Sequence, residues 1–158
     1  MLVRQREDED RPAVEALLAR HNASRGARRG ALMHPIEHPA LLAEEGDRLL
    51  GVLTYVIDGT DCEVLTIHAD ERRRGVGSAL LAALRPLAAR AGCTRLWVIT
   101  TNDNVDALRF YQRRGFRLTS LHAGAVDDSR ARLKPEIPEL GDHGIPLRDE
   151  LELELELP

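Results

Sequence analysis

The residues of this chain with the clearest chemical potential are Arg72-Arg73-Arg74-Gly75-Val76-Gly77, followed by Ser78. Glycines let the backbone approach a ligand closely and turn several N–H groups toward it, and neighbouring arginines supply positive charge for phosphate. A helical pattern starts at Ser78, so the positive end of the helix dipole points at the same place. The run therefore predicts a cradle for a pyrophosphate.

Two common nucleotide motifs do not fit this run. A Rossmann fingerprint needs a third glycine, but Leu80 follows Gly77-Ser78-Ala79. A nucleotide P-loop needs a Gly-Lys-Ser/Thr ending, which the run lacks. The pyrophosphate must therefore belong to another kind of ligand.

Composition and charge narrow the class of protein. With 158 residues, of which 43% are hydrophobic and 30% charged, the chain is expected to form a single globular domain. A net charge of −4 argues against a nucleic-acid partner. No apolar stretch approaches the ~20 residues of a membrane-spanning helix and residues 1–8 lack a secretory signal, so we expect a cytoplasmic protein without a membrane partner. Cys62 and Cys93 lack a Cys-x-x-Cys spacing, which favours reduced structural thiols and no metal.

The elements that position the arginine–glycine run follow from hydrophobic periodicity and from turn residues. Proline and glycine make residues 22–39 an irregular segment that can include one helical turn. Residues 148–157 alternate leucine with glutamate, which indicates a strand with one acidic face. The expected helices are 10–21, 78–91 and 105–114, and the expected strands are 2–5, 41–44, 48–57, 62–68, 95–100, 116–122 and 148–157.

Two motifs in this order resemble the GCN5-related N-acetyltransferase (GNAT) family. The first is a strand, then Arg72-x-x-Gly75-x-Gly77, then a helix and the next strand. The second is the segment from Asn102 to Phe116. The resemblance extends to about residue 122. It implies an α/β (α+β) three-layer fold whose central sheet is mixed, mostly antiparallel and splayed, with helices on both faces. One acetyltransferase domain would span 1–158, with an extended C-terminal excursion and a final strand at about 125–158, a tail similar to those of bacterial acetyltransferases.

The resemblance also implies that the protein is an acetyl-CoA-dependent N-acetyltransferase. Such an enzyme would move an acetyl group to a primary amine of a small molecule or peptide, by direct transfer in a ternary complex. The backbone N–H of Ile67 would face the thioester carbonyl, and Tyr111 would donate a proton to the departing sulfur. An alternative for Tyr111 is packing beside Phe110 and Phe116. The implied cofactor-binding residues are Ile67, Arg72, Arg73, Arg74, Gly75, Val76, Gly77, Ser78, Asn104 and Tyr111. The alternative for Asn104 is the N-cap of the helix at 105–114, and the two roles are compatible. Asn102 is expected to be a loop or cap residue.

The base that accepts the amine proton is left open by the sequence. Asp61, Glu63, Leu65 and Ile67 share strand parity, so Glu63 is the first candidate and Asp61 the second. A bulge in the strand would reverse this inference, and a water chain or an already neutral amine would make a base unnecessary. His68 has the opposite parity and is expected to be structural.

The sequence leaves open the role of the C-terminal excursion and the choice between an enzyme and a binding protein. The acceptor pocket is expected around residues 22–39, and the excursion either closes over that pocket or forms the contact of a homodimer. Because the cofactor motif is clearer than any base, the alternative to an enzyme is a non-catalytic acyl-CoA-binding sensor or regulatory protein.

Overall fold

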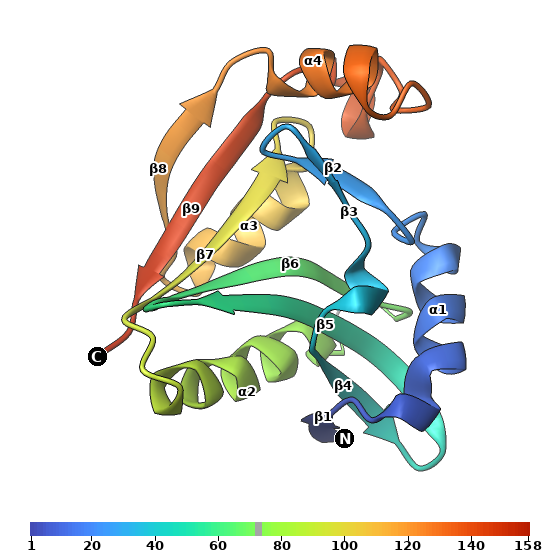
Figure 1. Cartoon of the computed structure of the whole chain (residues 1–158), viewed down its shortest axis with the longest axis vertical. Coiled ribbons are helices and arrows are strands. Elements are labelled where there is room, and N and C mark those ends of the chain that lie inside the picture. The colour runs from blue at the N-terminus through green and yellow to red at the C-terminus, as the bar shows by residue number, and fades with distance from the viewer. Residues whose placement is uncertain (72–73) are drawn as a thin grey trace. The chain divides into compact units, whose positions relative to one another are not determined.

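The computed structural model describes residues 1–71 and 74–158, and the chain forms two compact units (Figure 1). Unit 1 comprises Met1–Arg25, His34–Leu96 and Leu157–Pro158, and unit 2 comprises Gly26–Met33 and Trp97–Glu156. Within the described residues, no helix combines the length and apolar character needed to cross a membrane. Each unit combines helices with mostly antiparallel strands, which confirms the mixed α/β fold class.

Unit 1 is built on four neighbouring antiparallel strands in the order β1-β4-β5-β6. Single 3-10 turns at Asp8–Asp10 and Pro35–Glu37 precede α1 and β4. The chain leaves unit 1 inside the next strand, β7, between Leu96 and Trp97. The bounds are β1 Leu2–Gln5, α1 Arg11–Arg20, β4 Ala40–Glu45, β5 Arg48–Asp58, β6 Asp61–Ala69, α2 Val76–Arg90 and β7 Arg95–Thr101.

The two helices of unit 1 cover opposite faces of these strands (Figure 1). The apolar stripe of α1, spaced by three and four residues, packs on one face; this cluster contains Val14, Leu17, Leu18, Ala40, Leu42 and Val52. On the other face, a β-carbon at Gly51 would lie 2.6 Å from Cγ1 of Val76. The glycine therefore lets the first residue of α2 pack directly on the backbone of β5.

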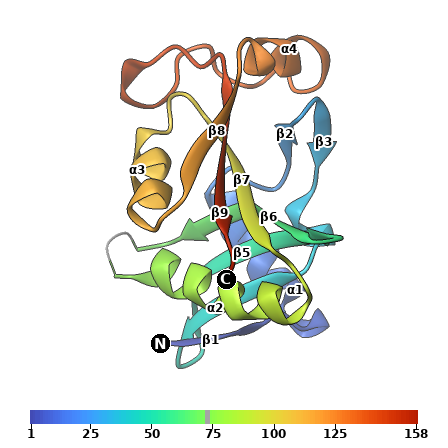
Figure 2. The same ribbon diagram turned by 90° about the vertical axis from the view of Figure 1, so that its left-hand side faces the viewer.

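Unit 2 contains β7 from Trp97 onward, and its strands follow the order β7-β9-β8, so β9 lies between β7 and β8. Figure 2 shows α3 and the β2–β3 hairpin on opposite sides of these strands. A 3-10 turn at Asp142–Gly144 lies in the excursion before β9. The bounds are β2 Gly26–Arg28, β3 Ala31–Met33, α3 Val105–Arg113, β8 Arg117–His122, α4 Ala125–Arg132 and β9 Glu150–Glu156.

Strand β9 has the two faces that its leucine–glutamate alternation predicts. Leu153 is fully buried and pairs with Leu118 of β8, and the side chain of Leu155 lies against Gly115 at the end of α3. On the other face, Oε1 of Glu152 lies 3.1 Å from Nε2 of His122. Glu150 departs from a solvated acidic face, because it is only 3% exposed.

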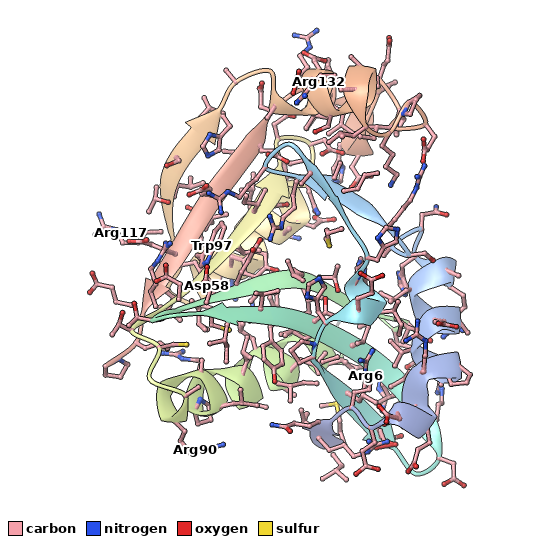
Figure 3. The ribbon with its side chains drawn as sticks, in the orientation of Figure 1. Arg6, Asp58, Arg90, Trp97, Arg117 and Arg132 are labelled. Atoms are coloured by element: carbon pink, nitrogen blue, oxygen red, sulfur yellow. The ribbon has the colours of Figure 1, made fainter. Side chains whose placement is uncertain are left out.

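The prediction of an irregular segment at 22–39 was incomplete, because β2 and β3 form a hairpin there. Its turn, Arg29-Gly30, has positive φ angles of 52° and 75°, which suit a tight two-residue hairpin turn. Arg29 is not a typical residue for that turn, so the sequence signal was weak. The Arg29 guanidinium lies 5.2 Å from the ring centre of Trp97, which Figure 3 labels, and the Arg29 N–H donates to Oε1 of Glu150.

Candidate functional site

The predicted anion cradle lies at the start of α2. Gly75 is the N-cap residue with φ 76° and ψ 12°, a left-handed conformation that favours glycine. Its carbonyl accepts the first helical hydrogen bond, from the N–H of Ala79 at 2.9 Å. The first N–H groups of a helix have no partner within it, and the first turn of α2 contains no acidic residue. This helix entry therefore suits an anion.

The arginines before Gly75 divide into two groups. Arg72 and Arg73 lie outside the described residues. The Arg74 side chain is paired with Oε2 of Glu45 at 2.9 Å and with Oε2 of Glu71 at 3.1 Å, and Glu71 also pairs with Arg48. Hydrogen bonds from Arg48 and Arg74 lower the pKa of Glu71. A phosphate would have to replace the carboxylates of Glu45 and Glu71 as the partner of Arg74. The sequence around Arg74 does not indicate that phosphate and these carboxylates compete for the same guanidinium.

The predicted orientation of Glu63 was wrong, and a β-bulge is the reason. Thr54 pairs with Thr66 but Tyr55 pairs with Val64, so Leu65 is an extra residue in β6. Val56 lies opposite Glu63, and Val56 shares a face of β5 with Thr54. Glu63 therefore shares the face that α1 covers with Thr66 and His68, whereas Ile67 points to the opposite face. The Glu63 side chain is buried, with 4% exposed.

Other polar groups line this same face of unit 1. Oγ1 of Thr54 lies 2.6 Å from Oγ1 of Thr66. The His68 ring stacks on His21 at a centroid distance of 5.1 Å, and Nε2 of His21 lies 3.1 Å from Oδ1 of Asp70. The sequence did not indicate that His21 and Thr54 belong to this face, because His21 meets a strand that is far away in the chain and the partner of Thr54 depends on the register between β5 and β6.

His68 makes the stability of unit 1 depend on pH. Burial, and secondarily the charge of His21, lower the pKa of His68 to about 4 from its ordinary value of 6.5. Between these two values the unfolded chain binds more protons than the folded one, so stability falls as the pH falls. We expect about 2 kcal/mol less free energy of unfolding from this group at about pH 5 than at about pH 7.

Urea unfolding at these two pH values measures the effect. A His68→Gln variant should lose this part of the difference between the two pH values, because it no longer titrates. His34→Gln is the matched control, since His34 is exposed to solvent. The same pH dependence in His68→Gln as in the unsubstituted protein would contradict the assignment.

Asp61, the second candidate base, is engaged elsewhere. Its carboxylate receives hydrogen bonds from Nε of Arg95 at 2.9 Å and from Nη2 of Arg95 at 3.3 Å. This two-pronged contact with the guanidinium occupies one lone pair on each carboxylate oxygen.

In unit 2, Asn104 and Tyr111 lie on α3. Oδ1 of Asn104 accepts a hydrogen bond from the N–H of Ala107 at 3.1 Å, which confirms its role as N-cap. Tyr111 is 3% exposed, and its ring meets Phe110 and Phe116 edge-on, each at a centroid distance of 5.2 Å. The packing environment predicted as the alternative is thus present. Burial also raises the pKa of Tyr111, so the phenol keeps its proton at neutral pH.

The two cysteines fit the expected structural role. Both are free and buried thiols. Burial raises the pKa of Cys62 to about 12 and also raises the pKa of Cys93. Because the thiolate is the reactive form, these thiols are poor nucleophiles and metal ligands at neutral pH.

The fold and the helix entry at Gly75 define a mixed α/β protein with a turn suited to an anion. The sequence profile of the acetyltransferase (GNAT) family matches residues 4–116. The "Uncharacterized protein YdhI" of Bacillus subtilis (strain 168) is 45% identical over 107 residues, which are 68% of this chain and 66%, just under two thirds, of YdhI. The chain belongs to the acetyltransferase (GNAT) family.

Solved structures support the same fold. An IAA acetyltransferase from Bacillus cereus ATCC 14579 superimposes with a TM-score of 0.74 at 24% identity and covers 99% of both chains. A Bacillus subtilis acetyltransferase in complex with CoA gives a TM-score of 0.69 at 20% identity, covering 99% of this chain and 98% of the other. These similarities confirm the GNAT-like fold.

Proposed function

We propose that this protein is an acetyl-CoA-dependent N-acetyltransferase that moves an acetyl group to a primary amine of a small molecule or peptide, by direct transfer in a ternary complex. The observation that carries the proposal is the entry to α2, where left-handed Gly75 opens a helix without acidic residues in its first turn. Membership of the GNAT family supports the reaction type. The CoA complex of a protein with the same fold supports the cofactor.

The helix entry fits a pyrophosphate. A β-carbon at Gly75 would meet no described atom within 4 Å, so the space in front of the turn is open. We assign the pyrophosphate to the backbone N–H groups of Val76, Gly77 and Ser78, with charge from Arg72, Arg73 and Arg74. Arg74 would exchange Glu45 and Glu71 for phosphate, and both are pairs at an exposed surface where such exchange costs little.

Bound acetyl-CoA supplies an activated thioester. The Ile67 N–H polarises the carbonyl oxygen, and Glu63 accepts one proton from the ammonium form of the acceptor, so that the neutral amine attacks and forms the new N–C bond. As the C–S bond breaks, Tyr111 donates its proton to the sulfur, and the proton that the nitrogen loses on becoming an amide restores the phenol. The Asn104 side chain keeps its Nδ2 group for the cofactor arm, since Oδ1 caps α3.

Calorimetric titration with acetyl-CoA, followed by an amine panel that monitors free thiol release, tests the proposal. We expect binding in about the micromolar range and thiol release with at least one primary amine. No binding of acetyl-CoA would contradict the proposal. Binding without transfer to any amine would indicate a sensor.

A Gly75→Ala variant tests the cradle separately. A β-carbon in this left-handed conformation costs about 1–2 kcal/mol, so the turn relaxes away from the geometry that presents its N–H groups. We expect the dissociation constant for acetyl-CoA to rise about tenfold. Gly59→Ala is the matched control, because Gly59 also has a positive φ of 61° with no described atom within 4 Å and lies in the β5–β6 turn. Equal affinities in both variants would remove Gly75 from the site.

A further inference from the structure

The excursion before β9 contains a narrow loop, residues 139–149, that closes on itself. The N–H of Gly141 donates to the carbonyl of Ile145 at 2.8 Å, and the N–H of Leu147 donates to the carbonyl of Glu139 at 2.9 Å. His143 and Gly144 turn the chain with positive φ angles of 59° and 72°. We call residues 139–149 the tail loop. It is ordered by its own backbone.

Asn102, in the connection between β7 and α3, holds one end of the tail loop. Its Oδ1 accepts hydrogen bonds from the N–H groups of Arg148 at 3.0 Å and Asp149 at 2.9 Å. Its Nδ2 donates to the carbonyl of Pro146 at 2.8 Å, and its backbone N–H donates to the carbonyl of Asp149 at 3.0 Å. Both the side chain and the backbone of Asn102 are therefore committed to the tail loop.

Asp103 holds the other end. This carboxylate is 6% exposed, and its Oδ2 accepts a hydrogen bond from the N–H of Asp142 at 2.9 Å while Oδ1 accepts from Thr101 at 2.5 Å. A β-carbon at Gly141 would lie 2.2 Å from the same Oδ2. Any larger residue at position 141 must displace the carboxylate or the loop.

These two residues directly precede Asn104, the N-cap of α3. Helix α3 has nine residues, fewer than the roughly 12–15 that an isolated helix needs to be even marginally stable in water. Its start must therefore be fixed from outside. The tail loop does so through Asn102 and Asp103, and Nε2 of His143 also lies 3.8 Å from Oδ2 of Asp106 in the first turn.

We propose that Asn102 and Asp103 are positioning residues through which the tail loop fixes the start of α3, and with it Asn104 and Tyr111, for binding acetyl-CoA. This inference rests on the proposed function. Neither residue touches the cofactor in this proposal. The tail loop acts by setting where the helix begins.

A double-mutant cycle between Gly141→Ala and Asp103→Ala tests the proposal. Gly141→Ala alone should raise the dissociation constant for acetyl-CoA about tenfold, because the new β-carbon displaces Asp103. In the Asp103→Ala background, the carboxylate atoms at 2.2 and 2.6 Å are gone and the close neighbour that remains is the β-carbon of residue 103, at 2.7 Å, so adding Gly141→Ala should change affinity less. If Gly141→Ala does not fold, Asp103→Asn replaces it as the test. Asparagine keeps the shape of Asp103 but loses its charge, so this variant should also raise the dissociation constant for acetyl-CoA.

Hydrogen exchange in the protein without cofactor gives an independent readout. The amides of Ala107 and Leu108 are bonded to Asn104, so they should exchange several times faster in Gly141→Ala than in the unsubstituted protein. Gly59→Ala, chosen as a destabilised control in unit 1, should leave both the affinity and these two amides unchanged.

The outcomes separate the two proposals. If the unsubstituted protein binds acetyl-CoA and Gly141→Ala matches it in affinity and exchange, the positioning role is overturned while the proposed function stands. An equal loss of affinity in Gly59→Ala at a similar melting temperature would overturn it as well, since the effect would then follow stability alone. Failure of the unsubstituted protein to bind acetyl-CoA would overturn both.

Discussion

A Tyr111→Phe variant is expected to turn over about a hundredfold more slowly than the unsubstituted protein, the lower end of what a positioned proton donor contributes. Burial raises the pKa of Tyr111 above its ordinary value, so the hydroxyl is protonated and available to the departing sulfur. Full transfer to a thiolate with a reference pKa near ~8.5 is uphill from such a phenol, so part of the stabilisation is a hydrogen bond. The measurement is kcat at saturating acetyl-CoA.

The chain offers a matched control for this variant. Tyr55 is its other tyrosine and is also buried, with 6% exposed. Tyr55→Phe should keep the turnover rate. Phenylalanine at position 111 retains the edge-on contacts with Phe110 and Phe116, so melting temperature should hardly change, and acetyl-CoA affinity should change by less than about tenfold. Unchanged kcat in Tyr111→Phe would leave Tyr111 with packing alone.

Local rules predicted those parts of the site that depend on neighbours in sequence. The glycine pattern predicted the helix entry, although α2 starts two residues earlier than the hydrophobic spacing indicated, at Val76. An asparagine before an amphipathic stretch predicted the N-cap Asn104. Leucine–glutamate alternation predicted β9. In each case the physical cause lies within one helical turn or one strand.

The predictions that were wrong or incomplete concern features that depend on contacts between separate segments of the chain. The bulge at Leu65 is a property of the register between β5 and β6, and one extra residue reverses the face of every side chain before it. The helix α4 was missed inside the excursion because it buries just Val126 and Ser129, so it lacks an apolar stripe. Its Arg130 instead donates to the carbonyls of Ile137, Pro138 and Leu147.

The role of Asn102 lay outside the reach of sequence reasoning for a similar reason. Its hydrogen-bond partners are 44 to 47 residues away. Nothing in the Asn102-Asp103-Asn104 run distinguishes a residue that caps a helix from one that holds the tail loop by hydrogen bonds. Location in the cytoplasm and a homodimer stay predictions of the sequence.

Replacing Glu63 with glutamine is expected to lower kcat/KM about a hundredfold near neutral pH, within the range of general base catalysis. The bulge places Glu63 on the face covered by α1, and glutamine keeps its size but cannot accept the amine proton. The variant then depends on amine that is already neutral, with a reference pKa near ~10.4 for an alkyl amine. Its rate should therefore rise with pH well beyond the point where the unsubstituted protein reaches its plateau.

The pH profile distinguishes a base from a structural carboxylate, because a merely misfolded variant would be slower at every pH. Glu156→Gln, at the exposed end of β9, is the matched control and should follow the unsubstituted profile. Asp61→Asn breaks the contact with Arg95 and provides the competing outcome. If Asp61→Asn shifts the profile and Glu63→Gln does not, the base is Asp61. If neither substitution shifts it, the amine arrives neutral or loses its proton to water, and Glu63 has no catalytic role.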